Sequence, residues 1–311
     1  MIPPAPVIAL AEVAVALLVS LEAQRRGIRR AWGRRFFQHP LAMFSIFMVT
    51  TFVLLAIAAP WVTRYPPSQP LDIIALQNRP PSLLHPLGTD VYSRDVWSRL
   101  IYGSRVSLAV GALAMLVAVT IGALVGAVAG YMRGGIDAVL MRIVDVGLAV
   151  PRIYLLLLAV ALWEHLPLVL LVLIIGLTGW FGTSRLVRAE VLALREREFV
   201  AAARAMGGEP GRIIARHVIP NVLTPIVVSA ALGIGNVMLL EAGLSFLGFG
   251  VQPPTPSWGN MIADGAAHLA TAPWSTLFPG LAIALVVTSL NAVGDALRDA
   301  LDPRRYRIGD T

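Results

Sequence analysis

Residues 41–61 form an uninterrupted run of 21 residues without a charged side chain. A helix of about 20 apolar residues is long enough to cross the hydrocarbon core of a bilayer. Only helices and closed barrels can cross that core, because every backbone N–H and C=O group must be paired within the protein. The run therefore predicts an all-α membrane protein.

Further apolar stretches extend this pattern to six predicted transmembrane helices. The five that follow the first cover residues 106–131, 146–163, 168–183, 222–240 and 274–293. Pro151 should kink the third helix, because proline removes one backbone hydrogen bond. Residues 6–21 are also apolar, but they include Glu12 and are too few to cross comfortably. We expect them to lie at the interface, with a seventh span as the alternative.

The composition excludes several classes of function. Hydrophobic residues make up 57% of the chain and charged residues 14%, against about 25% charged residues in soluble domains. The chain has no Lys, which excludes a Walker A phosphate loop, and no Cys, which excludes disulfides and thiolate metal ligands. The net charge of +7 fits basic cytoplasmic loops better than nucleic-acid binding in so apolar a chain.

The placement of Arg predicts that both termini are cytoplasmic. Nineteen Arg residues fall before the first span, in the loops after the second and fourth spans, and in the tail, whereas five fall on the predicted external side, among residues 62–105. Basic residues concentrate on the cytoplasmic side of membrane proteins. The predicted segments are an extension (1–40), a first span (41–61), an external loop (62–103), a five-helix domain (104–295) and a tail (296–311).

Residues 198–221 form a predicted helix–turn–helix elbow between the fourth and fifth spans. Ala201, Ala202 and Ala203 are strong helix formers, Gly207 ends that helix, and Pro210 can open a second one. The second helix continues through Gly211, Arg212, Arg216 and His217. Its cations suit the C-terminal end of a helix dipole. Such an elbow, with small side chains at its bend, can enter a groove on another protein; the alternative is a solvated loop.

The elbow resembles the cytoplasmic loop of ABC importer permeases, which reads EAA, three residues, Gly, nine residues and I-x-L-P. Here Ala201 to Ala203 take the first position, Gly207 follows at the right spacing, and residues 217–220 read HVIP. Ala201 replaces Glu and His217 replaces Ile. Both departures are familiar in the dipeptide/oligopeptide/nickel branch, whose loops read AARAxG and end in HILPN, as Pro220 and Asn221 do here.

Other motifs resemble the same branch. Residues 85–96 (HPLGTDVYSRDV) are similar to its HPLGTDxxGRDV signature, with Ser93 in place of Gly. Residues 241–250 and 254–260 resemble its outer segment, and residues 294–304 resemble its tail. The resemblance covers roughly residues 30–305 and points to the C-type permease of a peptide importer.

The resemblance implies a type I ABC importer permease fold and a division of labour among chains. A second, B-type permease would complete the path, an external solute-binding protein would deliver substrate, and two ATPases would bind ATP and Mg²⁺. The chain itself would be neither an enzyme nor a cofactor-binding protein, and it would sit in a bacterial or archaeal cytoplasmic membrane. Residues 210–216 would be the helix that couples to an ATPase.

The substrate implied is a di- or oligopeptide. Nickel or another small solute is the alternative within the branch. A secondary transporter driven by an ion gradient is the alternative outside it. That class needs acidic or His side chains at mid-membrane, and the centres of most predicted spans carry no charge.

Four further features carry open interpretations. Arg142 and Asp145 are three residues apart at the cytoplasmic end of the third span, so they either pair and gate the path or snorkel to water. Glu241 is either a site for a peptide amino group or a hydrogen-bonded structural acid. The remaining two features are a possible but disfavoured metal site at His85, Asp90 and Asp95, and the GxxxG repeat of Gly122, Gly126 and Gly130.

Overall fold

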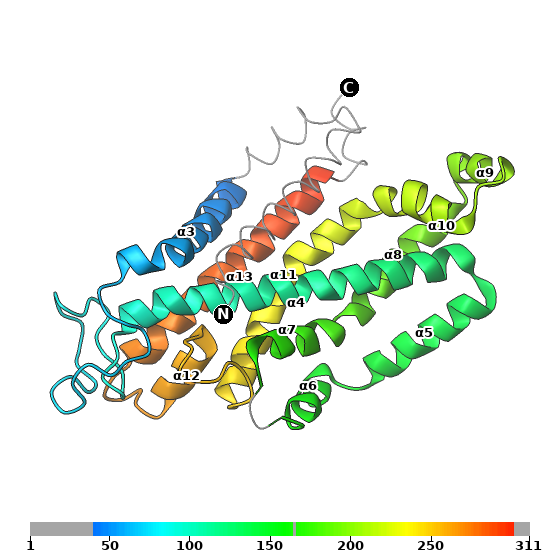
Figure 1. Cartoon of the computed structure of the whole chain (residues 1–311). Coiled ribbons are helices and arrows are strands. Elements are labelled where there is room, and N and C mark those ends of the chain that lie inside the picture. Colours follow the sequence, from blue (N-terminus) through cyan, green and yellow to red (C-terminus); the bar gives the residue numbers. More distant parts are fainter. Residues whose placement is uncertain (1–39, 164–165, 302–311) are drawn as a thin grey trace.

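The computed structural model describes residues 40–163 and 166–301, and this part of the chain is built from helices without a β-strand. Its principal helices, labelled in Figure 1, are α3 (Pro40–Val62), α4 (Val96–Met132), α5 (Gly134–Ala149), α6 (Arg152–Val160), α7 (Leu168–Leu177), α8 (Trp180–Arg195), α9 (Glu198–Ala205), α10 (Pro210–Ile213), α11 (Leu223–Phe246), α12 (Trp258–Ala266) and α13 (Trp274–Leu301). The predicted interfacial segment 6–21 and most of the predicted extension and tail lie outside the described residues.

The described helices agree with six predicted membrane crossings. The helices α3, α4, α11 and α13 are each long and apolar enough to cross a bilayer. The pairs α5 with α6 and α7 with α8 meet the same criterion together, so the number rises to six if each bent pair is one span.

The third span differs from its prediction because Pro151 breaks the helix instead of kinking it. The helix α5 ends at Ala149, α6 begins at Arg152, and the two axes differ by 83°. A residue before proline is pushed out of the helical region, and Val150 is indeed extended, with φ −94° and ψ 127°. The predicted span also began too late, because α5 already begins at Gly134.

The second span also begins earlier than predicted. Asp95 caps α4, since its side chain accepts a 2.8 Å hydrogen bond from the Ser98 backbone N–H. The helix therefore starts ten residues before the expected start at Val106. The predicted boundary between the external loop and the five-helix domain, at 103/104, falls inside this helix.

The GxxxG repeat is confirmed as a helix-packing surface. An added Cβ atom would lie 2.7 Å from Thr183 Cβ at Gly122, 2.4 Å from the Ser184 carbonyl at Gly126, and 2.9 Å from the Arg188 carbonyl at Gly130. No larger residue fits at these distances, so α4 and α8 pack backbone against backbone.

Trp258, the first residue of α12, anchors this helix to the rest of the bundle. Its side chain is fully buried, and the indole Nε1–H donates to the Leu100 carbonyl at 3.0 Å. Its backbone N–H donates to Ser107 Oγ at 3.1 Å, and its ring meets Phe52 edge-on. These contacts join α12 to α4 and α3. Figure 1 shows α12 and the long loop after α3 at one end of the bundle and α9 and α10 at the other.

Candidate coupling elbow and transport groove

The elbow turns at Gly207, as the sequence predicts. The Gly208 N–H donates to the Ala203 carbonyl at 3.1 Å, and the Gly207 N–H donates to the Arg204 carbonyl at 3.0 Å. These two bonds make a Schellman motif, which requires a left-handed residue after the helix. Gly207 has φ +78°, and only glycine adopts that conformation without strain.

The second elbow helix is shorter than predicted. Regular α-helix ends at Ile213, and a π-helical turn (Ile214–Val218) and a 3₁₀ turn (Ile219–Asn221) follow. Pro220 has no N–H to donate back into the helix, so the last turn cannot close normally. The Asn221 side chain satisfies one carbonyl of this turn by donating to the His217 carbonyl at 2.6 Å.

The elbow has a buried side and an exposed side. Val200, Ala203, Ile213 and Val218 are buried in the same hydrophobic core as residues of α4 and α8. Ala203 therefore faces the core of the helix bundle, and not the outer surface where the elbow was expected to meet a partner. The other candidate residues are exposed or half-buried: Ala201, Ala202, Gly207, Pro210, Gly211, Arg212, Arg216, His217, Pro220 and Asn221.

Met206 is a surface feature that sequence reasoning missed. Its side chain is 82% exposed at the tip of the elbow, directly before Gly207. An added Cβ at Gly207 or Gly211 would meet nothing within 4 Å, so both glycines face open space. Methionine is an adaptable apolar side chain that suits binding surfaces. Its place beside a predicted turn was the only signal in the sequence.

Two ion pairs connect α5 to α8, and a third connects the residues that directly flank these helices. Arg188 binds both carboxylate oxygens of Asp137 at 2.6 Å each. Asp145 pairs with Arg185, and Arg133 Nη1 lies 3.4 Å from Glu196 Oε1. Of the two interpretations of Arg142 and Asp145, the structure does not support a pair between them, because α8 lies beside α5 and offers Asp145 a partner on the neighbouring helix.

Glu241 is a buried acid within α11. Its side chain is 0% exposed and accepts hydrogen bonds from Ser245 Oγ at 2.6 Å and from Ser107 Oγ at 3.4 Å. Ser107 Oγ also accepts from the Trp258 N–H. This burial and bonding favour the interpretation of Glu241 as a structural acid that joins α11 to α4.

The side chains of the possible metal site contact one another and Arg. His85 Nδ1 donates to Asp95 Oδ1 at 2.9 Å, and Arg94 Nε donates to Asp90 Oδ2 at 2.7 Å. Arg94 reaches Asp264 as well, at 2.6 Å, and so fastens the loop between α3 and α4 to α12. The arrangement is that of a structural ion-pair cluster.

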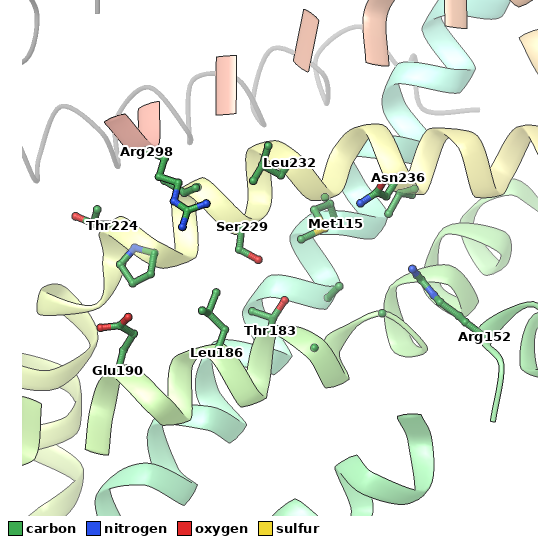
Figure 2. Close-up of a pocket in the computed structure, with 17 residues that line it drawn as sticks. Met115, Arg152, Thr183, Leu186, Glu190, Thr224, Ser229, Leu232, Asn236 and Arg298 are labelled. Carbon is green, nitrogen blue, oxygen red and sulfur yellow. The ribbon is translucent and has the colours of Figure 1, made fainter. Parts of the chain in front are cut away.

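A cavity of about 670 Å³ opens between α4, α8 and α11. Figure 2 shows Glu190 and Arg298 toward one end of it and Arg152 toward the other. Its uncharged polar lining comes from Thr183, Thr224, Ser229 and Asn236. We call this cavity the groove. Both its volume and its mixture of apolar and polar side chains suit a small organic ligand.

Residues 118–307 match the family model described as "Binding-protein-dependent transport system inner membrane component". The chain belongs to this family of inner-membrane transport permeases. Residues 28–81 of the permease match a second model, the N-terminal transmembrane domain of oligopeptide transport permease C.

Curated relatives are similar to the permease along most of its length. It is 43% identical over 277 residues to the dipeptide transport system permease protein DppC of Alkalihalophilus pseudofirmus, covering 88% of this chain and 90% of the relative. It is 42% identical over 279 residues to a putative peptide permease protein of Brucella suis, again covering 88% and 90%.

The site residues predicted from the sequence are not the residues that line the groove of the permease. The elbow residues lie on one segment, and all of them except Ala203 are exposed or half-buried there. Arg142, Asp145 and Glu241 do not line the groove. The groove residues were missed because they come from five helices that are distant in sequence. The one signal in the sequence was Arg152, a charged residue inside a predicted span, because such a residue suggests a functional site by default.

Proposed function

We propose that this permease is the C-type subunit of an ATP-driven importer for di- and oligopeptides. The observation that carries the proposal is the 43% identity, over 88% of the chain, to a relative named as a dipeptide transport permease. The proposed partners are a B-type permease, two ATPases that hydrolyse ATP with Mg²⁺, an external solute-binding protein and membrane lipid. The chain itself then performs no hydrolysis.

The exposed face of the elbow is the proposed contact with an ATPase. It presents Met206 and two unobstructed glycines at its tip, with Arg212 and Arg216 beside them. An apolar tip with small neighbours fits closely into a cleft, and flanking cations favour an acidic rim.

Movement of the elbow would be transmitted to the groove through its side-chain contacts with α4 and α8. Arg195 Nη1, at the end of α8, donates to the Tyr131 carbonyl at 2.7 Å, and the Tyr131 ring lies under both Arg195 and Arg204. The elbow's buried side chains share a core with α4 and α8. Since α4 and α8 also line the groove, a displaced elbow would move two of its walls as one body.

Uptake into vesicles tests this function. The permease is reconstituted with its partner permease, both ATPases and the binding protein, and labelled dialanine uptake is measured with and without ATP. We expect uptake that requires ATP and continues when an uncoupler removes the ion gradient. Uptake abolished by the uncoupler alone would indicate an ion-coupled transporter, and ATP-driven uptake of Ni²⁺ but not of dialanine would indicate the nickel alternative.

A further inference from the structure

Arg152 lies at the meeting point of the two broken spans. It is the first residue of α6, directly after the break at Pro151. Its Nη2 donates to the Ile175 carbonyl at 2.6 Å, and its Nε lies 3.4 Å from Thr178 Oγ1. Those partners are at the end of α7, where the bend toward α8 leaves carbonyls outside the regular helix ladder. The break thus holds the guanidinium in a fixed place.

These contacts use only part of the guanidinium. Arginine has five N–H donors in a planar fork, and the two bonds above involve one hydrogen on Nη2 and the hydrogen on Nε. The ion pairs found among residues 40–163 and 166–301 do not include Arg152. A charge inside a span is costly, so a permanent cation with donors to spare needs an anion at some stage.

The donors that remain are directed at the groove. Arg152 belongs to the groove lining, and Figure 2 shows its guanidinium pointing toward the cavity. Gly179, which follows the α7 end, would bring an added Cβ within 2.7 Å of Arg152 Nη2, so the glycine keeps the guanidinium uncovered. Asn236 and Ser229 lie along the same groove and offer an amide and a hydroxyl.

We propose that Arg152 binds the C-terminal carboxylate of a peptide in the groove. The planar fork of arginine matches a carboxylate in charge and in geometry. Asn236 and, in a longer peptide, Ser229 would then hydrogen-bond amide groups of the peptide backbone. This inference rests on the proposed function and deepens it, since it selects substrates with a free α-carboxylate and fixes their orientation.

Glu190 is too far from Arg152 to bind the amino group of a dipeptide whose carboxylate is held at Arg152. Glu190 is eleven residues after Gly179 on α8, which corresponds to about 16 Å along a helix. One extended residue spans about 3.5 Å. A dipeptide held at Arg152 therefore leaves its amino group near the polar middle of the groove, and only a longer peptide would approach Glu190.

Paired uptake measurements test the carboxylate site. The assembled transporter is given dialanine or dialanine amide, and each rate in a variant is divided by the wild-type rate for the same probe, so that selection by the binding protein cancels. We expect Arg152→Gln to lower the acid-to-amide ratio about tenfold, the effect of losing one charge-assisted hydrogen bond. Arg152→Lys should give an intermediate ratio, because the charge stays and the fork is lost.

Arg195→Gln is the matched control, because Arg195 also donates to a carbonyl at a helix end but does not line the groove. It should lower both rates by the same factor. An equal loss of both probes in Arg152→Gln would reduce Arg152 to a structural cap and overturn the proposal. Absence of ATP-driven uptake of either probe by the wild type would instead be a failure of the proposed function.

Chemical protection supplies an answer that does not depend on transport. Phenylglyoxal modifies free guanidinium groups, and mass spectrometry of the assembled transporter measures the modified fraction at Arg152. Excess dialanine should protect Arg152, while dialanine amide and glycerol should not. Protection by both peptides alike, or by neither, would overturn the assignment whatever the uptake data show.

Discussion

The guanidinium of Arg188 on α8 binds both carboxylate oxygens of Asp137 on α5, with two hydrogen bonds of 2.6 Å. Apart from Val144, the side chains of α5 are exposed or half-buried, so this helix has little apolar contact with the rest of the described chain. The bidentate pair therefore attaches α5 to α8, where apolar packing alone would hold α5 weakly. It also joins α5 to the helix that leads into the elbow.

A double-mutant cycle should measure this attachment. Asp137→Asn, Arg188→Gln and the double variant, compared by thermal unfolding of the purified permease complex, should give a coupling energy of about 1 kcal/mol or more, because the pair is bidentate and partly buried. The pair of Asp145 with Arg185 is the control. Its side chains are about half exposed, so its coupling should be at most about 0.5 kcal/mol. Equal coupling in both cycles would contradict the special role of Asp137.

Substitution of Gly126 should separate α4 from α8. An added Cβ would lie 2.4 Å from the Ser184 carbonyl, and backbone atoms cannot yield as a flexible side chain does. We expect Gly126→Ala to lower the unfolding temperature by several degrees, with a cost of about 1–3 kcal/mol for overpacking. Gly243→Ala is the control, since an added Cβ there meets nothing within 4 Å. Its unfolding temperature should match the wild type or exceed it.

The sequence predicted the span pattern because length and lack of charge are local properties. All six predicted spans have counterparts among the described helices. It failed at Pro151, because whether proline kinks or breaks a helix depends on what the neighbouring helix offers. Here the end of α7 receives Arg152 just beyond the break, which stabilises two separate helices.

The elbow and the groove show the same limit. The turn at Gly207 was predictable, since a Schellman motif needs only a few adjacent residues. The inward orientation of Ala203 was not, because it follows from how α9 rests on α8. Asp145 likewise chose Arg185, which is forty residues away in sequence. Residues of the groove come from α4, α6, α8, α11 and α13, and no local pattern unites them.

Glu241 variants should distinguish a structural acid from a peptide-binding one. Glu241→Gln keeps the size of the side chain and an oxygen that accepts from Ser245, so the permease should assemble and retain at least about a third of its dialanine uptake, a cost below roughly 1 kcal/mol. Glu241→Leu leaves two buried serine hydroxyls without their acceptor, and the yield of folded permease should fall. Normal assembly with abolished uptake in Glu241→Gln would instead indicate that the negative charge binds substrate.

Gly207 variants should test the elbow itself. The glycine has φ +78° and faces open space, so a substitution there acts through backbone strain and through the surface offered to a partner. Asn tolerates the left-handed conformation better than other residues. We therefore expect Gly207→Asn to keep most of the dialanine uptake and Gly207→Arg to lose it, together with substrate-stimulated ATP hydrolysis, while the amount of permease in the membrane stays unchanged.

The control for added bulk is Gly135→Arg, which places the same side chain at another open glycine, near the start of α5 and outside the elbow segment. It should transport like the wild type. Co-purification of the ATPases with each variant separates weak binding from failed coupling: Gly207→Arg should retain less ATPase than Gly135→Arg. Normal uptake in Gly207→Arg, at normal membrane levels, would remove the elbow tip from the coupling contact and leave Arg212 and Arg216 as the surface to examine.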